Sequence, residues 1–568
     1  MMTTLMTRRT LTTGVATLVA CSLALFGLLG PTGPGDEAVS FIVQGHDLAS
    51  ATAAVRDVGG TVTHELGIIH AVGAELTPTQ VRALRAAPDA PRILEDSRVE
   101  VAKKPVKVDN TIPDTGYPSR VEANLLHDEG ITGAGVNVAV LDTGWENFGV
   151  FSLDTAGEWR VLKSYDAIQD VIVDLPWRGP VYYPPSWGEN DQNGHASHLM
   201  SIMLSGMRTN YYEPDEPGLY HGLAPDAGLV VVKAFGPDGG AQSADVIRGI
   251  DWIVQNKDVY GIRVLNCSFG APVRSHYWED PLNQAVMAAW EAGIVVVASA
   301  GNNGPDPMTV GVPGNVPYVI TVGAMTDNYT PADGSDDRLA SFSATGPTYE
   351  GFVKPDVLAP GGHMMGLVPY NSTLYTDHPE FFGEESRFTM SGTSQSAALV
   401  SGIVTLMLQV DPTLTPEDVK CGLMATARAA QAPDGTTPYT VFQQGAGMVN
   451  AYDAAYGGHT GCANGGMDIT KDLDGTEHYA GPAGQDANGD FVLLGETGDG
   501  TTWDGTYSGA DGYPWSDGYP WSDGYPWSDG YPWSDGYPWS DGYPWSDGYP
   551  WSNGLAETMA INVWVPQE

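Results

Sequence analysis

Residues 138–144 read Val-Ala-Val-Leu-Asp-Thr-Gly: four apolar residues, then a carboxylate, then a turn. A short apolar run of this kind is typical of a strand buried on both faces, as in a parallel sheet. In such sheets ligands gather at the carboxyl ends of the strands, so Asp142 is well placed for function. An ordinary Asp at the start of a turn before Gly144 explains the motif about equally well.

From about residue 135 to 457, short apolar runs like this one alternate with helical patterns. The predicted strands are Val136–Leu141, Leu229–Ala234, Ile262–Cys267, Ile294–Ser299 and Tyr318–Gly323, and helices are predicted near Asp245–Gln255, Pro281–Ala292, Ser394–Gln409 and Thr415–Ala427. Apolar strands separated by helices indicate a parallel sheet covered on both faces. We expect an α/β domain with a doubly wound parallel sheet.

A second polar stretch, residues 191–198, reads Asp-Gln-Asn-Gly-His-Ala-Ser-His. Gly194 releases the chain into a helix, so His195 falls in the first turn, where the positive helix end disfavours imidazolium. A neutral imidazole can accept a proton. His198 shares this helix face, and we expect it to pack or to bond to the backbone, because a metal site would lack a third ligand nearby.

A third stretch, residues 388–397, reads Phe-Thr-Met-Ser-Gly-Thr-Ser-Gln-Ser-Ala and opens a long apolar helix. The Ser394 hydroxyl then lies at the positive helix end, and its own N–H points toward any oxyanion formed there. A serine that merely caps the helix is an equally simple explanation of this motif alone.

Together the three stretches resemble the subtilisin-like serine proteases, or subtilases, in which the catalytic residues come in the order Asp, His, Ser. The resemblance covers about residues 38–455 and includes matches at 222–227, 319–324 and 354–361. It implies a serine endopeptidase that cleaves protein or peptide substrates through an acyl-enzyme. Ser394 would be the nucleophile, His195 the general base and then acid, and Asp142 the group that orients the imidazole.

The resemblance also implies a cleft for the substrate. Asn302 matches the family's oxyanion-hole amide, although without the resemblance Asn302-Asn303-Gly304 would indicate only a turn. Two extended edges would pair with the peptide backbone, and Gly311 would lie at the base of a pocket for large apolar side chains. The residues expected in these edges are Ser268, Phe269, Gly270, Ser299, Ala300 and Gly301.

The sequence departs from the family pattern in three places. Ala196-Ser197 follows His195 where the family has Gly-Thr, and residues 395–399 read Gln-Ser-Ala-Ala-Leu where it has Met-Ala-Ala-Pro-His. Neither change removes a catalytic group. An insertion rich in Trp, Tyr and Pro, residues 177–187, is expected to border the cleft.

The N-terminal part suggests an exported precursor. Residues 1–35, with Arg8 and Arg9 ahead of an apolar run, are typical of a secretory signal peptide, although an uncleaved anchor is the alternative. Residues 36–105 show a β-α-β-β-α-β pattern, a small ferredoxin-like α+β unit. They resemble the family's propeptide, an intramolecular inhibitor removed by cleavage within Glu100–Asn110. The catalytic domain is then expected at 106–457.

The C-terminal part changes in composition. Residues 458–510 are interpreted as a Gly- and Asp-rich linker, 511–552 hold seven Asp-Gly-Tyr-Pro-Trp-Ser repeats, and 553–568 form a short closing segment. A proline every six residues prevents a regular ladder, so an extended low-complexity stalk is expected. The alternative is an aromatic array that contacts the cell envelope or a polysaccharide. Joined to a catalytically inactive domain, such an array would make a binding protein rather than an enzyme.

The composition limits partners and cofactors. Among 568 residues, Asp and Glu total 69 and Lys and Arg 26, a net charge of −43 that argues against nucleic acid or an anionic membrane as partner. We expect a solvated surface on a secreted, extracellular enzyme.

No cofactor or metal is expected in catalysis, but the resemblance allows structural calcium near Glu213, Asp215 and Glu216 or in residues 486–490. Cys267 is expected to be a packed free thiol, and the sequence leaves open whether Cys421 and Cys462 pair.

Overall fold

The computed structural model describes residues 38–96, 98–101, 116–173, 191–208, 220–330, 333–383, 386–430, 438–486, 488–494, 519–520 and 565. The predicted signal peptide, the insertion at 177–187 and nearly all of the repeat array lie outside these residues. The predicted acidic cluster at Glu213, Asp215 and Glu216 also lies outside them.

A nine-stranded sheet forms the centre of the protein, with strand order β15-β14-β13-β11-β6-β9-β7-β8 and β16 beside β14. Its strands are β6 (Asn137–Asp142), β7 (Val161–Asp166), β8 (Val171–Val173), β9 (Gly228–Lys233), β11 (Ile262–Cys267), β13 (Val295–Ser299), β14 (Ile320–Thr326), β15 (Arg338–Leu339) and β16 (Val357–Pro360). All pair in parallel except the two antiparallel edge strands β8 and β15. The predicted doubly wound parallel sheet is confirmed, because strands buried on both faces are continuous apolar runs.

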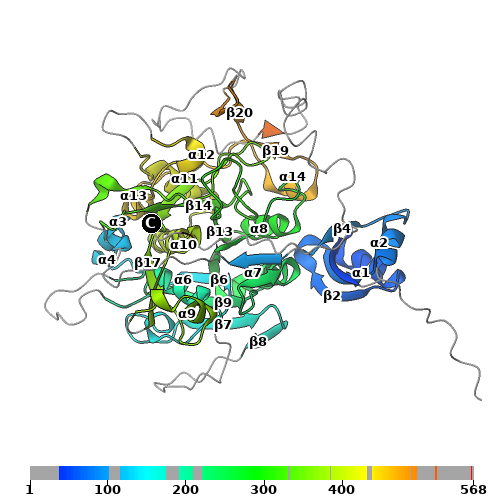
Figure 1. The fold of residues 1–568 in the computed structure, drawn as a ribbon, viewed down its shortest axis with the longest axis horizontal. Helices are drawn as coiled ribbons and strands as arrows, with labels where there is room; N and C mark the ends of the chain where they lie inside the picture. The colour runs from blue at the N-terminus through cyan, green and yellow to red at the C-terminus, as the bar shows by residue number, and fades with distance from the viewer. Residues whose placement is uncertain are drawn as a thin grey trace, which may run out of the picture.

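Two layers of helices cover this sheet (Figure 1). One contains α7 (Ser243–Tyr260) and α8 (Pro281–Glu291), which pack on each other, and the other contains α6 (His195–Leu204) and α10 (Thr393–Val410). Smaller helices complete the domain: α3 (Tyr117–Arg120), α4 (Ala123–Asp128), α5 (Gly149–Ser152), α9 (Thr373–Asp377), α11 (Pro416–Thr426), α12 (Val441–Gln444) and α13 (Ala451–Tyr456). The layers bury the carboxyl end of β6 between them.

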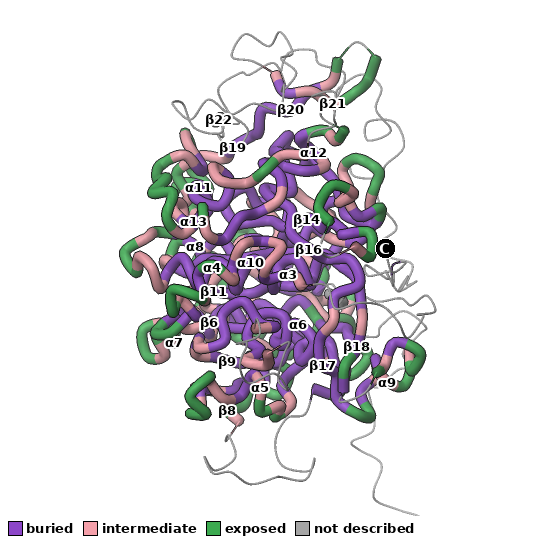
Figure 2. Tube along the Cα trace, turned by 90° about the vertical axis from the view of Figure 1, so that its left-hand side faces the viewer, coloured by how far each residue is buried: buried purple, intermediate pink, exposed green. Residues whose placement is uncertain are grey.

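Helix α10 runs through the core. Among the residues described, it is the one helix long and apolar enough to cross a membrane, but 89% of that stretch is buried inside the protein. It packs against α6, β11, β13 and β14. Figure 2 shows the chain around α10 almost entirely buried. The helix therefore has the environment of a core helix.

The N-terminal unit has the predicted β-α-β-β-α-β order. Its elements are β1 (Val39–Gln44), α1 (Leu48–Asp57), β2 (Thr61–Leu66), β3 (Ala71–Leu76), α2 (Pro78–Arg85) and β4 (Arg92–Glu95), in an antiparallel sheet of order β2-β3-β1-β4. Asp47 and Thr77 cap its helices, and it has a hydrophobic core of its own. Between β2 and β3, residues 67–69 form a 3₁₀ turn that ends at His70, whose φ is +54°.

This unit docks on the catalytic domain through α7 and α8, beside which it lies in Figure 1. The Asp96 carboxylate accepts a hydrogen bond from the N–H of Ala244 at the start of α7, at 3.0 Å. His64 Nε2 lies 2.7 Å from an Asp245 carboxylate oxygen. Burial raises the pKa of Asp96, against the opposing effect of its hydrogen bonds. The contact surface combines these polar contacts with the apolar side chains of Ile42, Leu66 and Ile69, which belong to the main core.

The linker predicted at 458–510 is wrong for the part that the structure describes. Residues 469–485 include α14 (Ile469–Asp474), β19 (Tyr479–Ala480) and β20 (Ala483–Gln485), followed by β21 (Phe491–Leu493), and their apolar residues join the main core. The Asp472 carboxylate accepts hydrogen bonds from the hydroxyls of Tyr277 at 2.5 Å and Tyr318 at 3.0 Å. A disulfide between Cys421 and Cys462 ties the segment down, which settles the pairing that the sequence left open. Cys267 is a buried free thiol, as expected.

Candidate active site

Asp142 ends β6 at the centre of the sheet, and its side chain is buried. One carboxylate oxygen accepts a hydrogen bond from the N–H of Thr143 at 2.7 Å. His195 Nδ1 lies 2.9 Å and 3.0 Å from the two oxygens of the same carboxylate. The acceptor-only carboxylate fixes the proton of the imidazole on Nδ1. The predicted approach of Asp142 and His195, which are 53 positions apart, is present.

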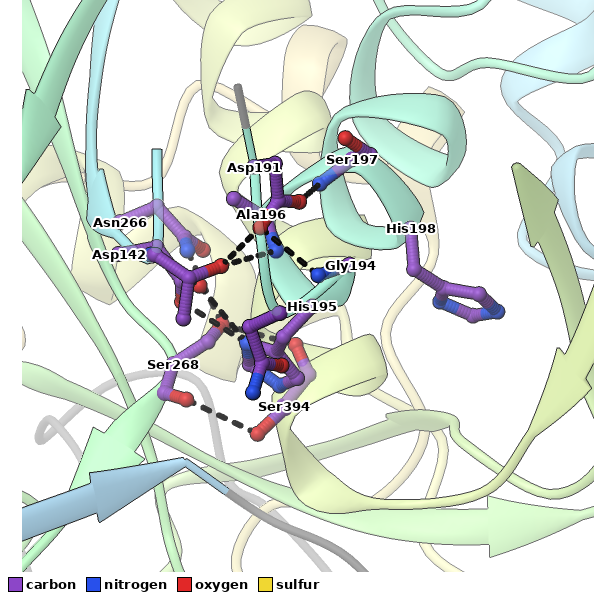
Figure 3. A network of polar contacts seen from close by, with 12 residues as sticks. Asp142, Asp191, Gly194, His195, Ala196, Ser197, His198, Asn266, Ser268 and Ser394 are labelled. Carbon is purple, nitrogen blue, oxygen red and sulfur yellow. Dashed lines mark hydrogen bonds and ion pairs between the residues drawn. The ribbon is translucent and has the colours of Figure 1, made fainter. Parts of the chain in front are cut away.

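His195 opens α6, as the sequence predicts. Gly194 has a φ of +99°, which a side chain rarely adopts, and an added Cβ there would lie 2.7 Å from Val368. His195 Nε2 is buried and has no hydrogen-bond partner among the described residues. With the proton held on Nδ1, Nε2 is left as an acceptor. Figure 3 shows the ring between Asp142 and Ser394.

Ser394 lies in the first turn of α10, after Gly392 and Thr393. Its hydroxyl donates to the carbonyl oxygen of Ser268 at 3.0 Å rather than to His195, and the Ser268 hydroxyl donates to the Ser394 carbonyl at 2.9 Å (Figure 3). Hydrogen bonds between nucleophile and base are often absent or long in enzymes without substrate. Three side chains from β6, α6 and α10 thus meet in one buried place.

Asn302 follows β13 and reaches the same place. Its side-chain oxygen accepts hydrogen bonds from the N–H and the hydroxyl of Thr393, both at 2.9 Å. These bonds assign the oxygen, so Nδ2 is the free end of the amide. Nδ2 is buried without a partner among the described residues, and an added Cβ on Gly392 would lie 3.2 Å from it. A donor held beside the nucleophile can stabilise an oxyanion.

His198 has a different environment from His195 on the same helix. Its Nε2 lies 3.2 Å from the Met364 carbonyl and 3.1 Å from the Phe388 carbonyl. Complete burial, followed by the charge of His195, lowers the pKa of His198 to about 3. His198 is therefore neutral and bonded to the backbone, as expected, and serves packing rather than metal binding.

The first expected substrate edge, residues 268–270, is occupied by the N-terminal unit's own chain. Strand β5 (Arg98–Val101) pairs antiparallel with β12 (Phe269–Gly270) on one side and with β10 (Gly240–Gln242) on the other. The chain that follows β4 is thus the middle strand of a three-stranded sheet, next to the segment that contains Ser268. Strand β10 was missed, since three residues with glycine and glutamine give no strand pattern.

The expectation that residues 299–301 form the second edge stays a prediction, although several of their backbone groups have partners within the protein. The Ala300 N–H donates to Val322 and its carbonyl accepts from Gly311, at 3.0 and 3.2 Å, so these groups are already bonded. The Gly301 N–H donates to the Thr393 hydroxyl. The sequence could not show this, because the competing partners come from distant segments. A Cβ added to Gly311 would lie 2.7 Å from the Ala271 carbonyl, so this glycine permits a close approach of the chain.

Asp191 is a residue of the site that the sequence did not assign a role. One carboxylate oxygen accepts from the Thr143 hydroxyl at 2.7 Å and the Gly194 N–H at 2.8 Å, and the other accepts from the Ser197 N–H at 2.8 Å (Figure 3). The Thr143 hydroxyl in turn accepts from the Ala196 N–H at 3.0 Å. Asp191 therefore joins the end of β6 to the start of α6. The sequence feature that could have indicated this role is a carboxylate four residues before His195.

The calcium expectation has little support from the donors described. The Asp486 carboxylate accepts from the N–H groups of Asn488 and Asp490, both at 2.9 Å, which lowers its pKa and occupies one oxygen within its own turn. No group of three or more His, Cys, Asp or Glu residues suited to a metal occurs in the described part of the chain. Structural calcium at residues 486–490 therefore stays a prediction.

Comparison with known proteins agrees with this geometry. The profile of the subtilase family matches residues 133–447, more than half of the chain. The chain is 34% identical over 357 residues to serine protease AprX of Bacillus subtilis (strain 168), covering 62% of this chain and 73% of that protein. It is 28% identical over 415 residues to subtilisin E of the same strain, covering 72% and 87%.

A solved structure of fervidolysin from Fervidobacterium pennivorans, described as a keratinolytic enzyme related to subtilisin, matches with a TM-score of 0.54 and 23% identity. The match covers 82% of this chain and 66% of that one, and at this identity it supports the fold alone. The profile match and the relationship to AprX and subtilisin E lead to one conclusion: the chain belongs to the subtilase family and is a serine-type endopeptidase.

Proposed function

We propose that this protease cleaves peptide bonds with Ser394, His195 and Asp142 as its catalytic triad. The proposal rests on the hydrogen bonding of the two ring nitrogens of His195. Its Nδ1 faces both oxygens of the Asp142 carboxylate, while Nε2 is buried without a partner among the described residues. A buried acceptor left open costs free energy, and a reaction that places a proton there offsets that cost.

In the proposed reaction, Ser394 Oγ forms a bond to the substrate carbonyl carbon as its proton moves to His195 Nε2. The carbonyl oxygen becomes an oxyanion, which Asn302 Nδ2 stabilises by a hydrogen bond. The carbon–nitrogen bond then breaks, and His195 gives its proton to the departing amine. A water molecule repeats the two steps on the acyl-enzyme and releases the acid. Asp142 stabilises the imidazolium formed in each step.

We also propose that the N-terminal unit is a propeptide that inhibits the enzyme and is removed by the enzyme itself. Strand β5 lies between β10 and β12, where a substrate would pair with the same backbone groups. The chain after β5 would be cleaved within Glu100–Asn110. The Ser268, Phe269 and Gly270 segment would bind substrate, and Ser299, Ala300, Gly301 and Gly311 would line the side-chain pocket.

The basic and apolar start of the chain supports export, so we propose an extracellular protease. Contact with the cell envelope through the repeat array is proposed as a secondary role. Deleting residues 511–552 and measuring retention on cell envelopes tests it, and unchanged retention would count against such contact.

The decisive test of the triad is labelling with a fluorophosphonate, which reacts with activated serines. We expect one adduct, on Ser394, in the wild type and in a Ser335→Ala control, whose serine is exposed. Ser394→Ala and His195→Gln should show no adduct. Labelling that is absent from the matured wild type, or that falls on another serine, would overturn the assignment.

Self-processing has a separate test. Purified Ser394→Ala should retain the N-terminal unit, and a trace of wild-type enzyme should remove it. If the Ser394→Ala protein is trimmed at the same bond without added enzyme, another protease performs the maturation.

A further inference from the structure

The structure places one residue from the far end of the chain on the catalytic domain. Val565 is only 3% exposed, and it packs with Ala324, Ala340 and Phe342 in a hydrophobic cluster separate from the main core. Ala324 belongs to β14, near the middle of Figure 1, and the other two belong to the segment after β15. We call this group of three residues the C-terminal seat. Val565 is the one member of the cluster from outside residues 324–342.

The segment that carries the seat also holds the loop that contains Asn302. The Gly304 N–H donates to the Phe342 carbonyl at 2.9 Å, and the Ala344 N–H donates to the Gly301 carbonyl at 2.9 Å. These two bonds fix the chain on both sides of Asn302. The Ala340 N–H donates to the Ala324 carbonyl at 3.0 Å, which connects the seat to β14.

Asn302 has few other restraints on the direction of its amide. Its oxygen is held by Thr393, while Nδ2 has no partner among the described residues. The position of Nδ2 therefore depends on Thr393 and on the backbone of residues 301–304. Catalysis by an oxyanion donor is sensitive to small displacements, because the donor must meet the oxygen at hydrogen-bond distance.

We propose that Val565 docks in this seat and thereby braces the oxyanion loop. The seat suits an aliphatic side chain, because its three residues are apolar and the side chain that packs on them is that of Val565. Val565 would act as a positioning residue, and not as a catalytic one. The docking stands by itself, whereas the brace rests on the role proposed for Asn302.

The first test compares Val565→Asp with Val259→Asp in the full chain. The control places the same substitution on a valine that is 70% exposed on α7. We expect Val565→Asp to lower kcat about threefold to tenfold, with KM changed less than twofold, and Val565→Ile to retain the wild-type kcat. Equal kcat values for Val565→Asp and Val259→Asp would overturn the brace.

The second test does not depend on activity. In the Ser394→Ala background, hydrogen exchange of residues 301–304 and 340–344 should be faster with Val565→Asp than with Val259→Asp, while exchange in β6 and β11 stays unchanged. Unchanged exchange in both segments would overturn the docking. If local protection is lost in this background while the protein that retains Ser394 has no measurable protease activity, the docking is confirmed and the proposed function is contradicted.

Discussion

Two regions of the catalytic domain bury charged side chains. In one, each charged group has a hydrogen-bonding or ionic partner, and in the other some buried polar atoms have none. In the lysine cluster, Lys354 and Lys420 contact the two oxygens of Asp356 at 2.6 and 3.1 Å. Lys354 also donates to the Val319 carbonyl at 2.8 Å, and Lys420 donates to Asn464 at 2.9 Å. Each charge there has a protein partner.

In the triad region, by contrast, His195 Nε2 and Asn302 Nδ2 are buried without partners among the described residues. Other open atoms exist, such as Glu350 Oε2 and Gln395 Oε1, but these two are an acceptor and a donor that both belong to side chains meeting the first turn of α10. An open buried atom costs free energy, so convergence of an acceptor and a donor on one serine indicates chemistry. The paired charges of the lysine cluster therefore stabilise the fold, whereas the open acceptor and donor beside Ser394 are available to a substrate.

Asp142→Asn is expected to give the largest effect. An asparagine can donate to the imidazole and so stabilise the wrong tautomer, which leaves Nε2 protonated and unable to act as a base. We expect kcat to fall about 10⁴-fold, roughly 5 kcal/mol, with little change in the unfolding midpoint. The control is Asp258→Asn, whose side chain is 90% exposed. An Asp142→Asn enzyme with kcat near wild type would break the assignment of the triad.

Lys420→Met should damage stability rather than chemistry. The substitution removes the donor to the Asn464 side-chain oxygen and one partner of Asp356 inside the protein. We expect unfolding in urea to cost about 3–5 kcal/mol less than in wild type, while kcat of the folded fraction is unchanged. Lys257→Met, a half-buried lysine beside the exposed Asp258, should change stability by less than about 0.5 kcal/mol. A stable Lys420→Met protein would contradict the structural role of the cluster.

Asn302→Ala tests the open donor. Without Nδ2 the oxyanion loses one hydrogen bond, while substrate binding in the ground state is hardly affected. We expect kcat to fall about 10²- to 10³-fold, roughly 3–4 kcal/mol, with KM within about twofold. If KM rises and kcat holds, Asn302 contributes to binding and has no role in the transition state.

His198→Gln tests the closed histidine by its pH dependence. The pKa of His198 is lowered to about 3, so the folded protein cannot take up the proton that the unfolded chain binds below about pH 6.5. Wild-type stability therefore falls as the pH drops from 6.5 toward 3, by roughly 2 kcal/mol at pH 5 from this group. Glutamine does not titrate, so the variant should lose about that much less between pH 7 and 5.

Urea unfolding at several pH values measures this difference. His459→Gln is the matched control, since that histidine is exposed. A pH dependence identical in wild type and His198→Gln would mean that His198 is protonated in the folded protein.

Elements that have a pattern in their own few residues could be predicted from the sequence. Elements that depend on contacts with distant segments could not. Strands such as Ile262–Cys267 were predicted at their observed ends, because burial on both faces requires a continuous apolar run. The triad residues were predicted because each lies in a local motif at an element end. Strand β10 and the packed segment around Asp472 were not, since their partners are remote and their residues are glycine-rich or polar. Only the folded chain shows that hydrogen bonds from Tyr277 and Tyr318 offset the free-energy cost of burying the Asp472 carboxylate.

Asp191 combines properties of the two regions. Both of its carboxylate oxygens have partners, as in the lysine cluster, but those partners belong to the triad region. Its carboxylate holds Thr143, which follows Asp142, and also the first turn of α6, which carries His195. Asp191→Asn keeps the size of the side chain but replaces one acceptor oxygen by a donor. At least one of the three N–H or O–H partners then loses its acceptor.

We expect kcat for Asp191→Asn to fall about tenfold, roughly 1–2 kcal/mol, from displacement of His195 relative to Asp142. A purely structural role would lower stability and leave kcat of the folded fraction unchanged. The value of kcat measured on the folded enzyme, beside its midpoint of unfolding in urea, therefore decides whether a fully paired carboxylate contributes to catalysis.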